Sequence, residues 1–314
     1  MAESVLVTGA NGFIGSHVTR LLESLGHKVI PIDVLPRSAD LSLLAIKTPS
    51  HIVNVTDATA FRELCAKEKP ARVFHAAHPP RDESPTVLNF CYHAMTNILE
   101  AAREIKIKRI VYSSSAAIYG QLKKPDGTLV KEDDAVTIYP TYFYRAAKTV
   151  SEWMGDFYKE KYGVSFVALR YSSVYGPGLY RSIPLELKKG ILGQPCRPFL
   201  TRPLDDLIYV DDIADAVHCA LFADKALSRA YNIGLDKTYV NEDLVQAIRK
   251  ALPELKFEIG QHPNAAEVAP HRLRDPLDIS LAKRELGWAP KIYLEEGIAR
   301  LAAWLTEHRA RLRV

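Results

Sequence analysis

The first half of the chain alternates between short continuous runs of apolar residues and stretches in which apolar residues recur at helical spacing. Continuous runs are typical of strands buried on both faces, and the longer period is typical of helices. The runs predict strands at residues 5–8, 27–32, 51–55, 72–77, 109–113 and 165–171. The helical spacing predicts helices at residues 13–25, 58–69 and 143–162, and a long one that ends near residue 105. Strands alternating with helices predict an α/β fold built on a doubly wound parallel sheet.

This alternation stops after Tyr171, where a loop containing Gly176, Pro177 and Gly178 begins. Helices are predicted beyond it at 183–190, 211–223, 241–252, 279–286 and 294–309, and strands at 207–210 and 230–233. We therefore expect a sheet domain at residues 1–171 and a smaller α/β domain at 172–314, with about 207–234 returning to the sheet. The charged, turn-rich residues 123–140 are expected to form a surface excursion.

The turn after the first strand contains Gly9, Gly12 and Gly15, spaced G-x-x-G-x-x-G, and a helix pattern follows at once. Gly9 would permit a tight turn, Gly12 would let a pyrophosphate approach the backbone, and Gly15 would let the helix lie close to the sheet. The first amides of that helix have no partner within it and attract anions. The alternative is a purely structural turn.

Asp33 ends the second predicted strand and makes the dinucleotide interpretation stronger. A carboxylate at this distance from the third glycine accepts hydrogen bonds from the ribose hydroxyls of an adenosine and repels a 2′-phosphate, which favours NAD over NADP. Ligands of doubly wound sheets bind beyond the carboxyl ends of the strands. Five segments are therefore expected to share one rim: Gly9 to Gly15, Asp33, Ala76 to His78, Ser113 to Ser115, and Tyr171 to Ser173.

Two further elements indicate the chemistry. Tyr144 and Lys148 are four residues apart and lie on one face of a predicted helix. A phenol has a pKa of about 10, but a neighbouring ammonium favours its phenolate, which can exchange a proton with an alcohol. Three serines, Ser113 to Ser115, end the fifth predicted strand and offer a hydroxyl to a substrate oxygen. Taken singly, these elements could be a surface pair on an amphipathic helix and a serine-rich turn.

Eight ordered stretches resemble the extended short-chain dehydrogenase/reductase superfamily, within it the NAD-dependent epimerase/dehydratase family that includes the UDP-galactose 4-epimerases. They are TGANGFIG (Thr8 to Gly15), HAA (His75 to Ala77), SSSAAIYG (Ser113 to Gly120), YRAAK (Tyr144 to Lys148), RYSSVYGPG (Arg170 to Gly178), LIYVDDIADA (Leu207 to Ala216), YNIG (Tyr231 to Gly234) and AKRELGWAP (Ala282 to Pro290). The resemblance implies an NAD-binding Rossmann domain followed by a substrate-binding lid domain. It also implies a homodimer in which the helix after the fourth strand and the Tyr144 helix form a four-helix bundle.

The resemblance assigns roles to particular residues. It implies that Ser115, Tyr144 and Lys148 are catalytic. It implies cofactor binding by Gly9, Asn11, Gly12, Phe13, Ile14, Gly15, Asp33, Asn54, Val55, Ala76, Ala77, His78, Ser113, Tyr144, Lys148, Tyr171, Ser173 and Val174. It implies substrate contacts by Ser115, Ala116, Tyr144, Ser173 and Arg202.

Some residues depart from the family pattern and leave the substrate open. Asp205 stands where an arginine grips the diphosphate of nucleotide sugars, although Arg202 is close in sequence, and Ser173 replaces an asparagine. Ala116 and Ala117 stand where 4,6-dehydratases carry an acidic pair, so elimination of water is not expected. An epimerase acting on a sugar or nucleotide sugar is the first hypothesis. A net dehydrogenase or reductase of a small sugar acid, polyol or lactone is the second, and a dinucleotide-sensing regulator is the third.

Composition excludes several other classes. The chain has 314 residues, of which 47% are hydrophobic, and a net charge of +4 with acids and bases interspersed, so neither a nucleic-acid nor a membrane partner is expected. The four cysteines are dispersed and form no Cys-x-x-Cys pair, which argues against a disulfide framework or a zinc site. His75 and His78 are not expected to share a metal. The first strand begins within a few residues of Met1, which leaves no room for a signal peptide, and we expect a cytoplasmic protein.

Overall fold

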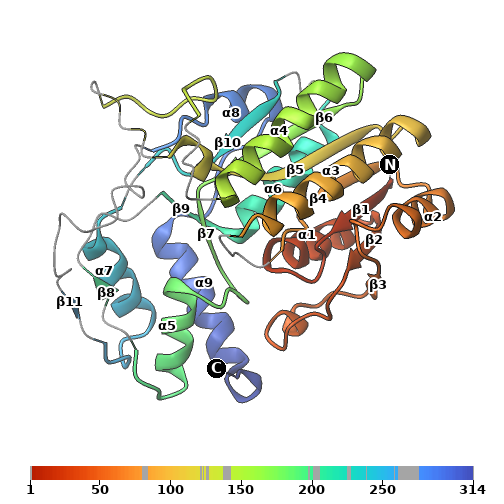
Figure 1. Cartoon of the computed structure of the whole chain (residues 1–314). Helices are drawn as coiled ribbons and strands as arrows, with labels where there is room; N and C mark the ends of the chain where they lie inside the picture. The colour runs from red at the N-terminus through yellow and green to blue at the C-terminus, as the bar shows by residue number, and fades with distance from the viewer. Residues whose placement is uncertain are drawn as a thin grey trace.

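A seven-stranded parallel sheet forms the centre of the molecule, with strand order β10-β6-β5-β4-β1-β2-β3 (Figure 1). The computed structural model describes residues 2–79, 84–120, 122, 124, 127–136, 143–196, 199–200, 206–224, 228–237, 239–257, 259–260 and 276–313. The predicted doubly wound α/β fold is confirmed. The strands are β1 (Ser4–Thr8), β2 (Lys28–Asp33), β3 (His51–Ile52), β4 (Arg72–His75), β5 (Arg109–Ser115), β6 (Phe166–Tyr171) and β10 (Ala230–Ile233).

Alternating side chains of each strand supply two hydrophobic cores, one on each face of the sheet. In β1, Val5 and Val7 belong to the core under α1 (Phe13–Ser24), α6 (Val210–Phe222) and α8 (Ser280–Leu286), while Leu6 belongs to the other core. That second core lies under α2 (Ala58–Glu68), α3 (Thr86–Ile105) and α4 (Phe143–Tyr162). Since both faces are covered, the strands are continuously apolar, as their sequence indicated.

The order of the strands reverses between β1 and β4, which are neighbours in the sheet. At such a point the loops leaving the two strands run to opposite faces and leave a crevice, where ligands of doubly wound sheets bind. The backbone amides of Ala76 and Ala77, just past β4, donate to the carbonyl and hydroxyl oxygens of Thr8 at 3.2 Å each. The exits of both strands are therefore held together at one place.

A third core lies away from the sheet, among α5 (Ser182–Ile191), α7 (Asn241–Ala251) and α9 (Leu294–Glu307), which group at the lower left of Figure 1. Two short two-stranded sheets accompany it: β7 (Ser173–Tyr175) with β9 (Leu207–Tyr209), and β8 (Phe199–Leu200) with β11 (Ile259–Gly260). Within residues 207–234, α6 and β10 pack on the large sheet, whereas β9 pairs with β7. The proposed domain boundaries stay a prediction. No helix among the described residues is long and apolar enough to cross a bilayer.

One prediction is wrong in its described part. Residues 127–136, expected on the surface, include Val130, which is fully buried in the core with α6 and α8. Its amide donates to Pro276 at 2.8 Å, and its carbonyl accepts from Asp278 at 2.7 Å, so the segment pairs with distant chain. Glu132 accepts a hydrogen bond from the backbone of Asn232 in β10 at 2.8 Å. Two adjacent apolar residues, Leu129 and Val130, before a run of charged ones gave too weak a signal for this packing.

Candidate functional site

At two of the three glycines of the turn, neighbouring backbone atoms leave no room for a side chain, and at the third there is more room. Gly9 has a φ of +67°, and a Cβ there would lie 2.7 Å from the amide nitrogen of Ala77. A Cβ on Gly15 would lie 2.1 Å from the carbonyl oxygen of Gly9, so the helix can approach only because this residue has no side chain. A Cβ on Gly12 would meet only the Gly9 oxygen, at 3.2 Å. Each glycine therefore has the geometry that pyrophosphate binding requires.

The first turn of α1 is a suitable anion site. Gly12 is the N-cap residue and provides no side-chain cap, and the first amide bonded within the helix is that of Ser16, at 2.9 Å from the Gly12 carbonyl. The amides of Phe13, Ile14 and Gly15 thus have no acceptor within the helix. Uncapped amides together with the helix dipole favour a phosphate at this position.

Asp33 is oriented by the backbone around it. Its carboxylate accepts from the amide of Asn11 in the glycine turn at 3.0 Å, and from those of Val34 and Leu35 at 2.7 and 3.2 Å. The side chain of Asn11 braces the same region, donating to the Leu35 carbonyl and accepting from Ser50, both at 2.7 Å. The acidic group therefore has a fixed position beside the glycine turn, as recognition of a ribose requires.

Asn54 and Val55 lie after β3. Asn54 is exposed, and its side-chain oxygen accepts from the amide and hydroxyl of Thr56 at 3.0 and 2.9 Å. Val55 is buried, and its carbonyl accepts from Asn97 of α3 at 2.9 Å. The Asn54 amide therefore stabilises its own turn, and its proposed contact with adenine stays a prediction.

Lys148 and Tyr144 face the end of β5 from α4. They are 4% and 8% exposed, and the Lys148 ammonium donates to the Ser113 carbonyl at 2.7 Å. The ammonium lies 5.6 Å from the centre of the Tyr144 ring and 4.9 Å from that of Tyr112. The ring of His78 stands edge-on to Tyr144, with centroids 5.1 Å apart. The helix spacing thus places two of the three proposed catalytic residues at the predicted rim.

Ser115, the third proposed catalytic residue, is the last residue of β5. It lies two positions beyond Ser113, so the two side chains share one face of the strand. Its hydroxyl oxygen accepts from the amide of Ala117 at 3.1 Å and caps a 3₁₀ turn, Ala116–Tyr119. The hydroxyl hydrogen of a capping serine remains available to another acceptor. β5 is longer than predicted, because all three serines continue the strand.

The remaining proposed contacts, at and beyond the ends of β5 and β6, differ in how far they are buried. Tyr171 pairs in register with Ser115, and burial raises the pKa of its phenol well above the usual value, so it stays protonated. Ser173 and Val174 are half-buried on β7. Ala116 is fully buried in the core with α6, and its proposed contact with a substrate stays a prediction.

Two residues that bear on the substrate, Arg202 and Asp205, lie outside the described residues, so the proposed diphosphate contact stays a prediction. Other acidic residues of that region have backbone or ionic partners. Asp212 accepts from the amides of Lys291 and Ile292 at 3.1 and 2.9 Å, and Asp211 pairs with Arg20 at 2.7 Å. In the part of the chain that the structure describes, no group of three or more His, Cys, Asp or Glu side chains is placed to hold a metal ion.

The sequence analysis missed two buried charged residues behind the rim, Glu152 and Arg170. Glu152 accepts from Ser114 at 2.5 Å and from the Arg170 guanidinium at 2.6 Å. A signal was present, because Glu152 follows Lys148 by four residues and must share its sheet-facing side of α4.

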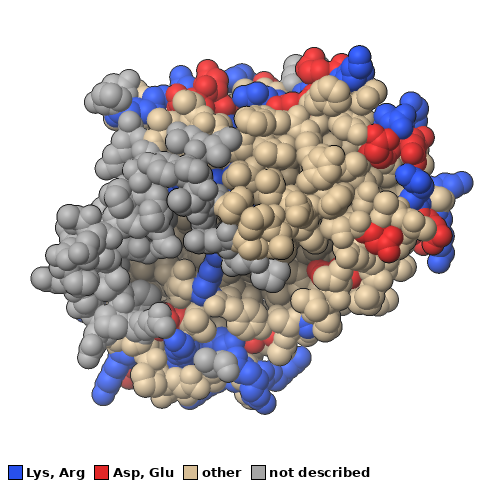
Figure 2. Space-filling view, in the orientation of Figure 1, with Lys and Arg blue, Asp and Glu red and all other residues tan. Residues whose placement is uncertain are grey.

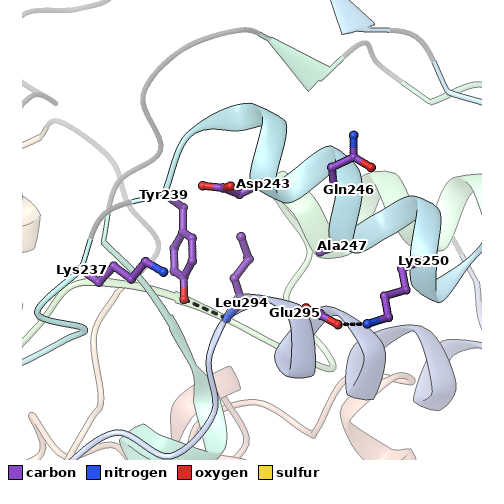
Figure 3. Close-up of a pocket in the computed structure, with 8 residues that line it drawn as sticks. All are labelled: Lys237, Tyr239, Asp243, Gln246, Ala247, Lys250, Leu294 and Glu295. Carbon is purple, nitrogen blue, oxygen red and sulfur yellow. Dashed lines mark hydrogen bonds and ion pairs between the residues drawn. The ribbon is translucent and has the colours of Figure 1, made fainter.

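A cavity lies apart from the residues described above. It is a cleft of about 290 Å³ between α7 and α9, lined by Lys237, Tyr239, Asp243, Gln246, Ala247, Lys250, Leu294 and Glu295 (Figure 3). Its polar groups contact one another: Lys250 pairs with Glu295, and Tyr239 accepts from the Leu294 amide at 3.3 Å. None of the proposed site residues lines this cleft.

Comparison with known proteins identifies the family of the chain. Residues 5–234 match the sequence profile described as the NAD dependent epimerase/dehydratase family. A putative UDP-glucose 4-epimerase of Methanocaldococcus jannaschii is 32% identical over 96% of this chain and 98% of its own length. A dTDP-glucose 4,6-dehydratase of Shigella flexneri is 29% identical over 96% of this chain and 92% of its own length. The solved UDP-glucose 4-epimerase of Thermus thermophilus in complex with NAD is 26% identical, with a TM-score of 0.79 over 96% of this chain and 98% of that one.

Proposed function

Because the chain belongs to the NAD dependent epimerase/dehydratase family, we propose that it is an epimerase acting at a carbinol carbon of a nucleotide sugar. One observation carries the proposal: Tyr144 and Lys148, both buried, meet the serine-bearing end of β5 at the same rim as the glycine turn. The family membership confirms NAD as the cofactor and an enzyme as the class of protein. The residue roles below are our proposals.

The cofactor fits the residues present. The amides at the start of α1 would hold the pyrophosphate, Asp33 would accept from the adenosine ribose, and Lys148 would hold the nicotinamide ribose. When bound, NAD would supply reversible hydride transfer, which inverts the carbinol carbon when the hydride returns to the opposite face of the ketone. The phenol of Tyr144 would take the proton of the substrate hydroxyl and give it back, and the Ser115 hydroxyl would hold that oxygen in place. The Lys148 ammonium, facing the Tyr144 ring, would stabilise the phenolate.

Epimerisation is favoured over dehydration by the residues after Ser115. Ala116 and Ala117 carry no acid or base, so nothing at these positions could remove or donate the proton that elimination of water requires. Relatives of both activities are similar to this chain, and its own two alanines support the choice of epimerisation. The named epimerase relative suggests a UDP-sugar as the first substrate to test.

The test is a substrate panel with purified protein. We expect UDP-glucose and UDP-galactose to interconvert without net NADH, and NAD to stay bound through gel filtration. Tyr144→Phe is expected to lower kcat by about 10²- to 10⁴-fold with NAD still bound, since it removes a general acid–base group. Tyr162→Phe, an exposed tyrosine on the same helix, is the matched control and should keep wild-type kcat.

A different outcome would favour the alternative hypothesis, in which the substrate is a small sugar acid, polyol or lactone. In that case NADH would accumulate with such a compound, NAD would exchange at every turnover, and no nucleotide sugar would react. Ser173, in place of the family's asparagine, is the described residue that supports this alternative. Net turnover of that kind would refute the epimerase proposal and leave the role of Tyr144 intact.

The assembly we propose is a homodimer formed by α3 and α4. Figure 2 shows a broad face over these helices that is nearly free of charged side chains. Tyr92, Trp153 and Phe157 are 50%, 57% and 56% exposed there, and such apolar patches mark interaction sites. Light scattering should give twice the mass of one chain for wild type and one chain for Phe157→Glu. Tyr293→Glu, at a 45% exposed position before α9, is the control and should not change the mass.

A further inference from the structure

Two of the buried charged residues of helix α4, Lys148 and Glu152, lie on the side that faces the end of β5. Lys148 and Glu152 are 4% and 5% exposed and one turn apart, and Tyr144 lies one turn earlier on the same side. The proposed reaction uses Tyr144 and Lys148 and gives Glu152 no part. A carboxylate is not buried without cost, so its presence behind the site requires an explanation.

Glu152 connects α4 to the end of β5. One of its oxygens accepts from the hydroxyl of Ser114 at 2.5 Å, and Arg170 of β6 donates to both oxygens, at 2.6 Å in the shortest contact. Ser114 is 3% exposed and directly precedes Ser115. The carboxylate therefore joins the helix that carries Tyr144 to the strand that carries Ser115.

Arg170 extends this connection to two more segments. Its Nη1 donates to the hydroxyl of Tyr119 at 2.7 Å and to the carbonyl of Glu132 at 2.8 Å. Tyr119 ends the 3₁₀ turn that Ser115 caps, and its hydroxyl donates to Asn232 of β10 at 2.8 Å. One guanidinium, 1% exposed, thus contacts α4 through Glu152 and the turn that Ser115 caps through Tyr119.

Stability alone is a poor explanation for this pair. Buried ion pairs can often be replaced by apolar side chains of similar volume without loss of stability, because burying two charges offsets their attraction. What an arginine provides is a rigid, planar set of donors that holds several acceptors in fixed directions, which a lysine cannot do. Burial opposes the Arg170 charge, but the bond with Glu152 outweighs it and raises the pKa of the guanidinium, so the group stays charged.

We propose that Glu152 and Arg170 are positioning residues that set the alignment of α4 against the end of β5. Through this alignment they determine where the Tyr144 phenol lies relative to the Ser115 hydroxyl. The inference rests on the proposed function of those two groups. Displacing reacting groups by about 1 Å can slow a reaction about 10²-fold, so loss of the pair is expected to affect the chemical step more than binding.

The experiment compares Arg170→Lys and Glu152→Gln with wild type in the NAD-bound enzyme. For the nucleotide sugar that wild type turns over, kcat should fall about 10²-fold while KM and NAD affinity change less than about threefold. A second readout needs no substrate: the ultraviolet difference absorbance of the Tyr144 phenolate, measured against Tyr144→Phe across pH. Both variants should displace this titration from its wild-type position.

The two readouts separate failure of the inference from failure of the proposed function. If wild type turns over no nucleotide sugar, the proposed function fails, and the phenolate titration still decides the positioning role. A titration unchanged in both variants would overturn the inference. So would a rise in KM and a loss of NAD affinity as large as the fall in kcat.

Two further variants distinguish positioning from stability. Arg109→Lys is the matched control, because Arg109 is a buried arginine at the opposite end of β5 that donates to the Ala220 carbonyl at 3.0 Å. It should lower the midpoint of thermal unfolding and leave kcat unchanged. The double variant Glu152→Met, Arg170→Met removes both charges. Measured well below its unfolding midpoint, it should keep the low kcat, and a wild-type kcat would show that the pair only stabilises the fold.

Discussion

The Lys148 ammonium donates to the carbonyl oxygen of Ser113 at 2.7 Å, which joins the middle of α4 to the end of β5. The same ammonium faces the rings of Tyr144 and Tyr112. One charge therefore fixes the backbone of the serine strand and lies beside the proposed acid–base group. A lysine in such a position cannot be replaced by a side chain that only fills its volume.

We expect Lys148→Met to lower kcat by about 10²-fold or more, because it removes the charge that stabilises the phenolate. It should also weaken NAD binding by about tenfold, since the ribose loses its ammonium partner and a charged hydrogen bond contributes about 1.5–3 kcal/mol. Stopped-flow kinetics and calorimetric titration with NAD measure the two effects. Lys161→Met, an exposed lysine near the end of α4, should change neither quantity.

Asp33 provides the test of cofactor choice. Asp33→Asn removes the charge that repels a 2′-phosphate, so the ratio of NAD affinity to NADP affinity should fall by about 10- to 100-fold. It also turns one oxygen that accepts amide bonds into a donor, so the protein should lose about 1–3 kcal/mol of stability. Asp57→Asn is the matched control, because Asp57 accepts from the amides of Thr59 and Ala60 at the start of α2. It should lower stability without changing the cofactor ratio, and a changed ratio there would contradict the role given to Asp33.

The segment after β2 is linked to α5 by a buried ion pair, Asp40 with Lys188, at 2.6 Å and with both side chains 4% exposed. Removing one partner leaves the other charge buried, so Lys188→Met should cost about 3–5 kcal/mol in the free energy of unfolding. The exposed pair of Lys28 with Glu68 contributes about 0–1 kcal/mol, and Lys28→Met should have a correspondingly small effect. Urea unfolding of the two variants compares them directly. Equal losses would show that burial does not govern these pairs.

Much of the fold follows from local pattern. Helix α4 was predicted at 143–162 and spans Phe143–Tyr162, because its apolar stripe is long, contains no proline and continues through the single glycine, Gly155. The glycine turn was predictable because its glycines follow a buried strand at fixed spacing, although the backbone that Gly9 meets, at Ala76 and Ala77, comes from the exit of β4. The positions of Tyr144 and Lys148 at the rim could be predicted because their four-residue spacing places them on one face of a helix. The alternation of strands and helices then indicates which end of the sheet that helix faces.

The parts that could not be predicted depend on contacts between distant segments. Val130 is buried by chain near residue 277, and nothing in its own charged neighbourhood indicates that partner. In the sequence, Arg170 is a single charged residue in an apolar strand. Its partners Glu152 and Tyr119 belong to two other elements, so the sequence does not indicate them. The burial of Ala116 in the core could not be predicted from its place in a motif, and its substrate contact stays a prediction.

His75 gives a pH dependence whose sign can be stated. It is fully buried at the end of β4 with its Nδ1 2.7 Å from the Thr8 hydroxyl, and burial lowers its pKa from 6.5 to about 3, with the Lys148 charge adding to the effect. Between these two values the unfolded chain binds a proton that the folded protein does not. Stability therefore falls as the pH is lowered through this interval, by about 1.4 kcal/mol per pH unit from this residue. Chemical unfolding at about pH 6, 5 and 4 should show a slope flatter by that amount in His75→Asn. The control is Thr8→Val, which removes the hydroxyl and no titrating group, so it should lower stability at each pH and keep most of the slope. A slope that is unchanged in His75→Asn would mean that the imidazole is protonated in the folded protein.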